Sequence, residues 1–171
     1  MCIDRSVLSV AGEYAVAAEL CRRNIYAQLT IGNLKRADLL VFLESGGMAK
    51  IEVKAKQGRD WPNCKGIVDT NTFIVFVDFE SKGESERPDF YVLSANEWRE
   101  HVDLVATLYK SKYPNRRVEI TQNNCLILLD EVNKAGKAYT GCGVRPEQIA
   151  RHREAWNKIK GFLARQDFQN K

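Results

Sequence analysis

The sequence is poor in the residues on which several common enzyme chemistries depend. It has two histidines, His101 and His152, and each lies in a charged segment, so a serine or cysteine nucleophile with a histidine base is not indicated. The five cysteines lack the close pairs of a zinc site or a redox motif. The glycines form no phosphate-binding loop with a lysine behind it. These absences argue against a triad hydrolase, a zinc-binding module and a P-loop protein.

Long apolar runs are absent as well. No stretch approaches the about 20 apolar residues that span a bilayer. Asp4 and Arg5 interrupt the N-terminal segment before any apolar run long enough for a signal peptide. Scattered cysteines, odd in number, are typical of a reducing compartment. We therefore expect a cytoplasmic protein without a membrane partner.

The composition is that of an ordinary folded protein. Of 171 residues, 44% are hydrophobic and 28% are charged, which predicts a packed core rather than a disordered chain. The formal net charge of +4 is mildly basic and compatible with a nucleic-acid partner. No internal repeat or low-complexity tract divides the chain, so we expect one domain over 1–171, with a core at about 6–113 and a C-terminal extension at 114–171.

Hydrophobic periodicity and turn signals predict a mixed α/β fold. Helices are expected over 7–24, with Ser6 as the cap, over 95–113, and over 145–166, where a basic amphipathic helix closes the chain. Strands are expected at 25–31, 37–44, 48–56, 72–79, 89–94 and 125–132. Loops are expected at 57–66 and 133–143.

The segment KIEVKAK, residues 50–56, places one glutamate among three lysines. Alternate side chains of a strand share a face, so these four charged residues point one way and the apolar residues between them point the other. With the preceding Ser-Gly-Gly as a three-residue turn, Asp38 lies opposite Lys54, and Leu40 lies opposite Glu52. Asp38, Glu52 and Lys54 then converge on one patch, whereas a one-residue change in register would send Asp38 to the other face.

Glu13 is a fourth candidate for this patch. It lies on the stripe of the first predicted helix that is expected to meet the sheet, together with Val10, Tyr14, Ala17 and Leu20. A buried carboxylate has to be paired, coordinated or neutralised. Three carboxylates and a lysine at one place suit Mg²⁺, which takes oxygen ligands and keeps waters for a substrate phosphate. Lys54 could orient such a water and offset charge on a five-coordinate phosphorus.

The pattern RAD-x13-EVK, preceded by a helix with Glu13, resembles the PD-(D/E)xK nuclease superfamily, which includes many restriction endonucleases, Holliday-junction resolvases and repair nucleases. GEYAVAAELCRRN, ADLLVF, IEVKAK, the DWP loop and ERPDFYVLS are similar to a group of small bacterial proteins within it. The resemblance covers about residues 7–98 well and the C-terminal third loosely. It implies a restriction-endonuclease-like fold, in which helices flank a mixed central sheet. Ala37 stands where the motif has proline, which weakens the signature without excluding activity.

The resemblance also implies a set of site residues. Asp38 and Glu52 match the metal-binding acids, and Lys54 matches the catalytic lysine. Glu13 matches a helix glutamate found in several of the families, and the backbone carbonyl of Val53 is a further ligand by the same analogy. The implied activity is hydrolysis of DNA phosphodiester bonds by an endonuclease with Mg²⁺, for which Mn²⁺ can substitute.

Nucleic-acid contacts are expected from residues beside these motifs. Lys35 and Arg36 come just before the first acid, and Lys56 and Gln57 come just after the catalytic lysine. Phosphate contacts from basic residues supply affinity that does not depend on base sequence. No separate specificity domain is visible, which favours structure-directed cleavage or a protein partner that supplies targeting. The sequence does not decide whether the protein is a monomer or a homodimer. Symmetrical cuts on both strands would need a dimer, because they need two sites.

Other interpretations remain. The strand could carry solvated lysines, with Glu52 in an ordinary ion pair with Lys54 or Lys56. The same fold could also serve, without catalysis, as a module that binds nucleic acid or protein. A more distant alternative is a nuclease that acts on RNA.

Overall fold

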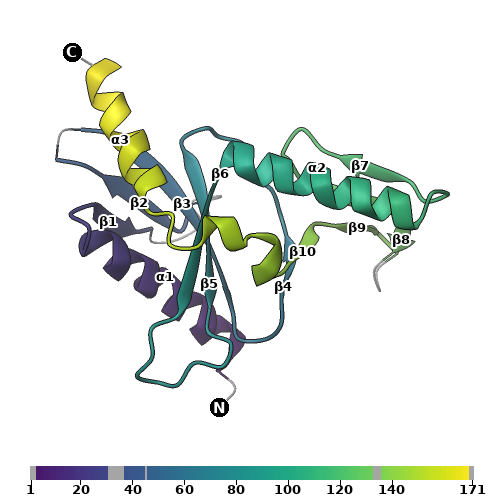
Figure 1. Ribbon diagram of the computed structural model, residues 1–171, viewed down its shortest axis with the longest axis horizontal. Helices are drawn as coiled ribbons and strands as arrows, with labels where there is room; N and C mark the ends of the chain where they lie inside the picture. The colour runs from purple at the N-terminus through teal and green to yellow at the C-terminus, as the bar shows by residue number, and fades with distance from the viewer. Residues whose placement is uncertain (1–2, 31–36, 45, 133–135, 170–171) are drawn as a thin grey trace.

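The computed structural model describes residues 3–30, 37–44, 46–132 and 136–169 (Figure 1). Its helices are α1 (Arg5–Cys21), α2 (Ala95–Lys112) and α3 (Asn157–Gln169), with 3₁₀ turns at Pro146–Gln148 and Ala150–His152. Its strands are β1 (Tyr26–Leu29), β2 (Leu39–Phe42), β3 (Met48–Lys56), β4 (Trp61–Cys64), β5 (Thr72–Asp78), β6 (Asp89–Ser94), β7 (Val118–Ile120), β8 (Leu126–Val132), β9 (Ala138–Thr140) and β10 (Cys142–Val144). Within these ranges, no helix is long and apolar enough to cross a membrane.

A five-stranded sheet in the order β1-β2-β3-β5-β6 forms the centre of the fold. β3 and β5 run parallel, and the other neighbours are antiparallel, so the sheet is mixed. β4 pairs with β10, and β7, β8 and β9 form a third sheet. In Figure 1, α1 and α3 lie on one side of the central sheet, and α2 lies with the smaller sheets on the other. The prediction of a mixed α/β protein with a central mixed sheet is confirmed.

The central strand β5 is buried along its whole length and separates two apolar cores. Val75 and Val77 face the core beneath α1 and α3, whereas Ile74 and Phe76 face the core beneath α2. On the neighbouring strand β3, the apolar side chains face α1 and α3. The charged side chains of β3 therefore point to the side of the smaller sheets, because successive strand residues alternate between faces.

Helix α1 begins at Arg5 and is capped by Asp4, whose carboxylate accepts a hydrogen bond of 2.8 Å from the backbone N–H of Ser6. The prediction that Ser6 is the cap is wrong, because aspartate two residues earlier satisfies a free N–H of the first turn. Further along, Gly12 lies directly on the sheet: a Cβ atom there would come within 2.8 Å of the Cβ of Ala55. Glycine therefore allows α1 to approach β3 closely.

The predicted sheet-facing stripe of α1 is partly wrong. Val10 and Tyr14, which were expected to meet the sheet, are exposed. The buried residues of this helix are Leu8, Gly12, Val16, Glu19 and Leu20. Because the helix turns its glycine side toward β3, Glu13 lies at the flank of the contact and is half-buried.

The register of the β2–β3 hairpin differs by two residues from the prediction. Leu39 pairs with Ile51 and Phe42 pairs with Met48, so the connection spans 43–47 instead of three residues. Gly47 packs on α3, where a Cβ atom would come within 2.4 Å of the carbonyl oxygen of Leu163. A shift of two residues keeps every side chain on its predicted face, because the side-chain period of a strand is two.

Two segments expected to be loops contain strands. In the segment 57–66, residues 61–64 form β4. In the segment 133–143, residues 138–140 form β9, and β10 begins at 142 and ends at 144. Cys64 lies opposite Cys142, and Trp61 lies opposite Val144. The partners are about 80 residues apart in sequence, so local patterns give no sign that the two segments pair. Residues 133–135 lie outside the described residues.

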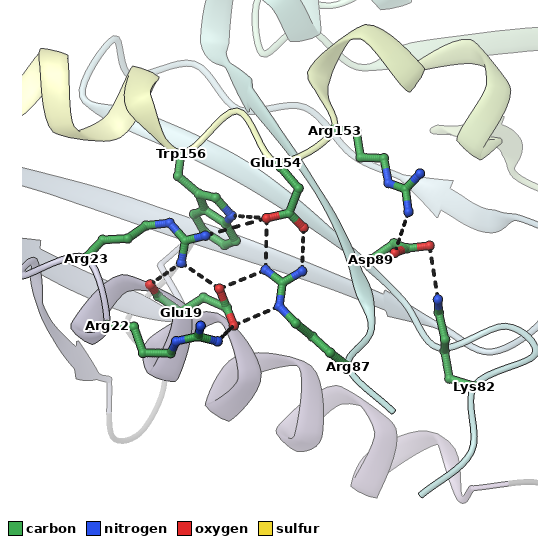
Figure 2. A network of polar contacts seen from close by, with 9 residues as sticks. All are labelled: Glu19, Arg22, Arg23, Lys82, Arg87, Asp89, Arg153, Glu154 and Trp156. Carbon is green, nitrogen blue, oxygen red and sulfur yellow. Dashed lines mark hydrogen bonds and ion pairs between the residues drawn. The ribbon is translucent and has the colours of Figure 1, made fainter. Parts of the chain in front are cut away.

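The C-terminal helix begins later than predicted, at Asn157 instead of 145. Arg153 forms a β-bridge with Tyr91, and the N–H of Glu154 donates to the carbonyl oxygen of Phe90 at 2.9 Å. β6 is an edge strand of the central sheet, and these contacts cover part of its open side. The Glu154 carboxylate then bonds Arg87, as Figure 2 shows, with distances of 2.8 and 2.9 Å.

Candidate functional site

A pocket of about 430 Å³ lies on the face of the sheet that carries the charged residues of β3. It is lined by Asp38, Glu52, Lys54, Lys65, Gly66, Thr121, Asn123, Cys125 and Thr140. Three of these residues are the motif residues of the β2–β3 hairpin, which the sequence predicts to converge. The other residues come from the segment after β4 and from the β7–β9 sheet.

Asp38 is fixed at the point where the β2–β3 ladder ends. Its backbone N–H donates to the carbonyl of Ile51 at 2.8 Å, and its own carbonyl accepts from the N–H of Thr30 at 3.0 Å. One carboxylate oxygen, Oδ2, accepts from the N–H of Val53 at 2.6 Å. This bond holds the side chain beside β3, and each carboxylate oxygen can accept more than one bond, so acceptor capacity remains for a ligand.

The backbone of Val53 presents a carbonyl on the same side. The N–H and C=O of a strand residue point in nearly the same direction, and the N–H of Val53 points to Asp38. The carbonyl therefore faces the edge near Asp38 instead of β5. This position agrees with the role of a backbone ligand that the resemblance implies for Val53.

Glu52 and Lys54 form an ion pair, with 2.6 Å between Oε1 and Nζ. The two residues share a face of β3, and their side chains are 13% and 32% exposed. An ordinary structural pair would make this contact, as the alternative interpretation of the strand expects. The same contact also holds the ammonium group of Lys54 at the pocket, next to Glu52.

Glu13 reaches the vicinity of this cluster from α1. Burial raises the pKa of its carboxyl group, the nearby Asp38 charge raises the pKa further, and Lys54 partly offsets both effects. Three carboxyl groups and one ammonium group therefore interact at this place. Such a cluster carries excess negative charge, which a cation would relieve.

Lys56 and Gln57 have other partners. Lys56, only 3% exposed, donates to Asp78 at 2.6 Å and to Glu80 at 2.9 Å, and its ammonium group lies 4.8 Å from the ring centroid of Trp61. The Gln57 side chain exchanges hydrogen bonds with the backbone of Ile3 at 3.0 and 2.8 Å. Neither side chain lines the pocket. Lys35 and Arg36 lie outside the described residues.

The thiols of Cys64 in β4 and Cys142 in β10 are poorly suited to chemistry. Burial raises the pKa of the Cys64 thiol, and burial also raises the pKa of Cys142 to about 12. A thiol acts as a nucleophile or metal ligand in its thiolate form, which these shifts disfavour.

The second wall of the pocket was not predicted from the sequence. Thr121, Asn123 and Thr140 come from segments that lie far from the hairpin in sequence, whereas Lys65 follows the end of β3 closely. The run TQNN has the composition of a turn, which was a usable local signal. Its position in the same pocket as the acids follows only from the packing of the β7–β9 sheet.

The carboxylates of the pocket meet some of the requirements of a divalent-cation site. Among the residues that the structure describes, no three His, Cys, Asp or Glu side chains are grouped so as to hold a metal ion. Mg²⁺, however, is commonly held by only one or two protein carboxylates and keeps several waters. Asp38 and Glu52 supply two carboxylates to one pocket, and this chemistry suits Mg²⁺ or Mn²⁺.

Searches among protein-family models, curated proteins and solved structures found no match to this chain.

Proposed function

We propose that this protein is a metal-dependent endonuclease with a restriction-endonuclease-like fold, which hydrolyses phosphodiester bonds in DNA. The observation that carries the proposal is the convergence of Asp38, Glu52 and Lys54 on one pocket, with Glu13 beside them. Two carboxylates, a nearby third and one ammonium group are the groups that metal-assisted phosphodiester hydrolysis uses.

Each residue has a role in this proposal. Asp38 and Glu52 would hold Mg²⁺ or Mn²⁺, with the Val53 carbonyl as a further ligand and Glu13 in support. A bound divalent ion supplies positive charge near the phosphate and lowers the pKa of water. Lys54 would orient the attacking water and stabilise negative charge that develops on the phosphate oxygens. No residue of the pocket is needed as a covalent nucleophile.

A second candidate is a module of the same fold that binds nucleic acid or protein without catalysis. The Glu52–Lys54 ion pair favours it, because Lys54 neutralises one of the two proposed ligands. The absence of a three-ligand metal group among the described residues favours it as well.

A cleavage assay separates the two candidates. Wild type, Lys54→Ala and Lys50→Ala would be incubated with duplex, single-stranded and four-way-junction DNA in Mg²⁺, Mn²⁺ or EDTA. Lys50 is the matched control, since it lies on the same strand and face but pairs with Asp69 at 3.1 Å. We expect metal-dependent cutting by wild type and Lys50→Ala, and a loss of at least about 100-fold in Lys54→Ala.

Other results would change the conclusion. Cutting that persists in EDTA, or equally in Lys54→Ala, would contradict the proposed mechanism. Salt-sensitive DNA binding without cutting would favour the binding module.

A further inference from the structure

We infer that the second wall of the pocket, formed by Lys65, Thr121, Asn123 and Thr140, binds an unpaired nucleotide of the DNA substrate. This inference rests on the proposed function, and it names the form of DNA that the site accepts. The wall lines the same cavity of about 430 Å³ as the catalytic candidates.

The wall is built around a tight turn between β7 and β8. The N–H of Thr121 donates to the carbonyl of Cys125 at 2.9 Å, and the N–H of Asn124 donates to the carbonyl of Thr121 at 3.0 Å. Asn124 has a φ of +52°, a left-handed conformation that asparagine tolerates better than most residues. These bonds fix the conformation of the residues that line the pocket.

Buried contacts anchor the same turn to the rest of the fold. The Asn124 side chain donates to the carbonyl of Ile67 at 2.9 Å, and Trp98 of α2 donates to the Asn124 carbonyl at 2.9 Å. A Cβ atom on Gly66 would lie 2.0 Å from the carbonyl oxygen of Asn123, so only glycine lets the two segments meet. The wall is therefore held rigidly against the segment that carries Lys65.

The wall offers both donors and acceptors. Thr121 Oγ1 accepts from the N–H groups of Asn123 and Cys125, each at 3.2 Å, so its own hydroxyl hydrogen can donate to a ligand. The Asn123 side chain has an amide donor and a carbonyl acceptor, a combination suited to the edge of a base. Lys65 is exposed and can bind a phosphate.

The size of the pocket suits one nucleotide. Pockets of this volume hold one small molecule, and an unpaired nucleotide can enter one without the strand that pairs with it. Asp38 and Glu52 line the same pocket, so a nucleotide bound at the wall lies in the cavity of the proposed metal ligands. Enzymes that act on a base bind it in such a pocket after it has left the stack, so a pocket of this kind can hold an unpaired nucleotide.

Binding measurements in EDTA test this inference without cleavage. Fluorescence anisotropy would follow a labelled oligothymidine, a duplex of the same length and an oligouridine. The proteins would be wild type, Lys65→Ala and Asn123→Ala, with Gln122→Ala and Lys110→Ala as controls. Gln122 and Lys110 are exposed and do not line the pocket.

We expect wild type to bind the single strand about tenfold more tightly than the duplex. Asn123→Ala should weaken this binding about fivefold without changing its salt dependence. Lys65→Ala should weaken binding of the single strand and make the negative slope of log K against log salt shallower by about one. The two control variants should bind as wild type does.

Equal affinity for duplex and single strand, or wall variants that behave like their controls, would overturn the inference. Tighter binding of oligouridine would overturn the assignment to DNA. The cleavage assay tests the proposed function separately. If wild type cuts DNA but the wall variants bind it normally, the proposed function is supported and the inference about the wall is wrong. If wild type never cuts but shows the expected binding, the inference about the wall is supported and the proposed nuclease activity is wrong.

Discussion

Two charged clusters in this fold differ in how completely their charges are compensated. Around Glu19, the carboxylate accepts from Arg87 at 2.9 and 2.8 Å and from Arg22 at 2.9 Å, and Arg23 also binds it (Figure 2). Glu154 joins the same network, so three guanidinium groups face two carboxylates. At the pocket, Lys54 lies beside three carboxyl groups, those of Asp38, Glu52 and the nearby Glu13, and Lys65 adds a second ammonium group to the lining, so the carboxyl groups outnumber the ammonium groups.

The two clusters therefore suit different purposes. The Glu19 cluster ties α1, the segment before β6 and the segment before α3 together, and it has little need of a ligand. The pocket cluster holds excess negative charge beside a cavity, where a cation and a phosphate can enter. Under-compensated charge is more often a sign of function than of stability.

The largest expected effect is on activity, from Asp38→Asn. Loss of one proposed ligand should lower cleavage by about 1,000-fold, as removal of a key electrostatic group does in other enzymes. The free energy of unfolding should change by less than about 1 kcal/mol, because the change relieves repulsion in the cluster. Single-turnover cleavage and urea unfolding check both parts. An equal loss of stability and activity would make Asp38 a structural residue.

The second effect is on stability, from Glu19→Gln. Breaking a buried ion-pair network should lower the free energy of unfolding by about 3 kcal/mol, with cleavage by the folded protein unchanged. Arg22→Ala is the matched control, since Arg22 is exposed and should cost less than about 1 kcal/mol. A Glu19→Gln protein as stable as wild type would show that the cluster does not hold the fold together.

Acid should weaken the Glu19 cluster in a defined range. Hydrogen bonds from Arg87, and then from Arg23, lower the pKa of Glu19 from 4.5 to about 2, against the effect of burial. The stabilisation is present above pH 4.5, because the unfolded chain binds the proton first, and it is lost as the pH falls toward 2. Urea unfolding at several pH values should show this slope in wild type and not in Glu19→Gln.

His101 adds a buried group without a compensating charge. Burial, and then the charges of His152 and Arg151, lower its pKa from 6.5 to about 4. The unfolded chain binds the proton below pH 6.5, so stability falls as the pH drops from 6.5 toward 4, by about 2 kcal/mol. His101→Phe keeps a ring beside Trp98 and should remove this part of the slope. An unchanged slope in His101→Phe would assign the pH dependence to other groups.

The smallest effect is expected from Glu13→Gln. Because the pKa of Glu13 is raised in the folded protein, its ionisation costs stability as the pH rises above 4.5. The variant should be slightly more stable than wild type at pH 7, whereas Glu19→Gln should be less stable. A destabilised Glu13→Gln would mean that Glu13 is compensated like Glu19.

Sequence patterns predicted the parts of the fold that depend on local periodicity. Strand β3 has its predicted bounds, and the faces of Asp38 and Glu52 follow from alternation even though the register is shifted by two residues. Alternation also gave the face of Lys56, which lies over Trp61, but not its partner, Asp78 on the parallel neighbour β5. An acid at the end of a buried strand was a signal for this pair, but only knowledge of the strand order makes it usable.

Non-local packing accounts for most of what the sequence did not show. The β4–β10 pair and the wall residue Asn123 depend on contacts between distant segments. The later start of α3 follows from the bonds of Glu154 to β6 and to Arg87, which outweigh the helical pattern of 145–156. Tertiary contacts of this kind routinely override local propensity.

Titration calorimetry with Mn²⁺ tests the central claim most directly, because it measures the affinity and stoichiometry of the cation binding that the excess negative charge should favour. Wild type and Lys50→Ala should bind one Mn²⁺ per chain, and Asp38→Asn should lose this binding. Lys54→Ala should bind Mn²⁺ at least as tightly as wild type, because it removes the ammonium group that competes for Glu52. Mn²⁺ binding that is absent from wild type, or unchanged in Asp38→Asn, would contradict the assignment of this pocket as a metal-dependent nuclease site.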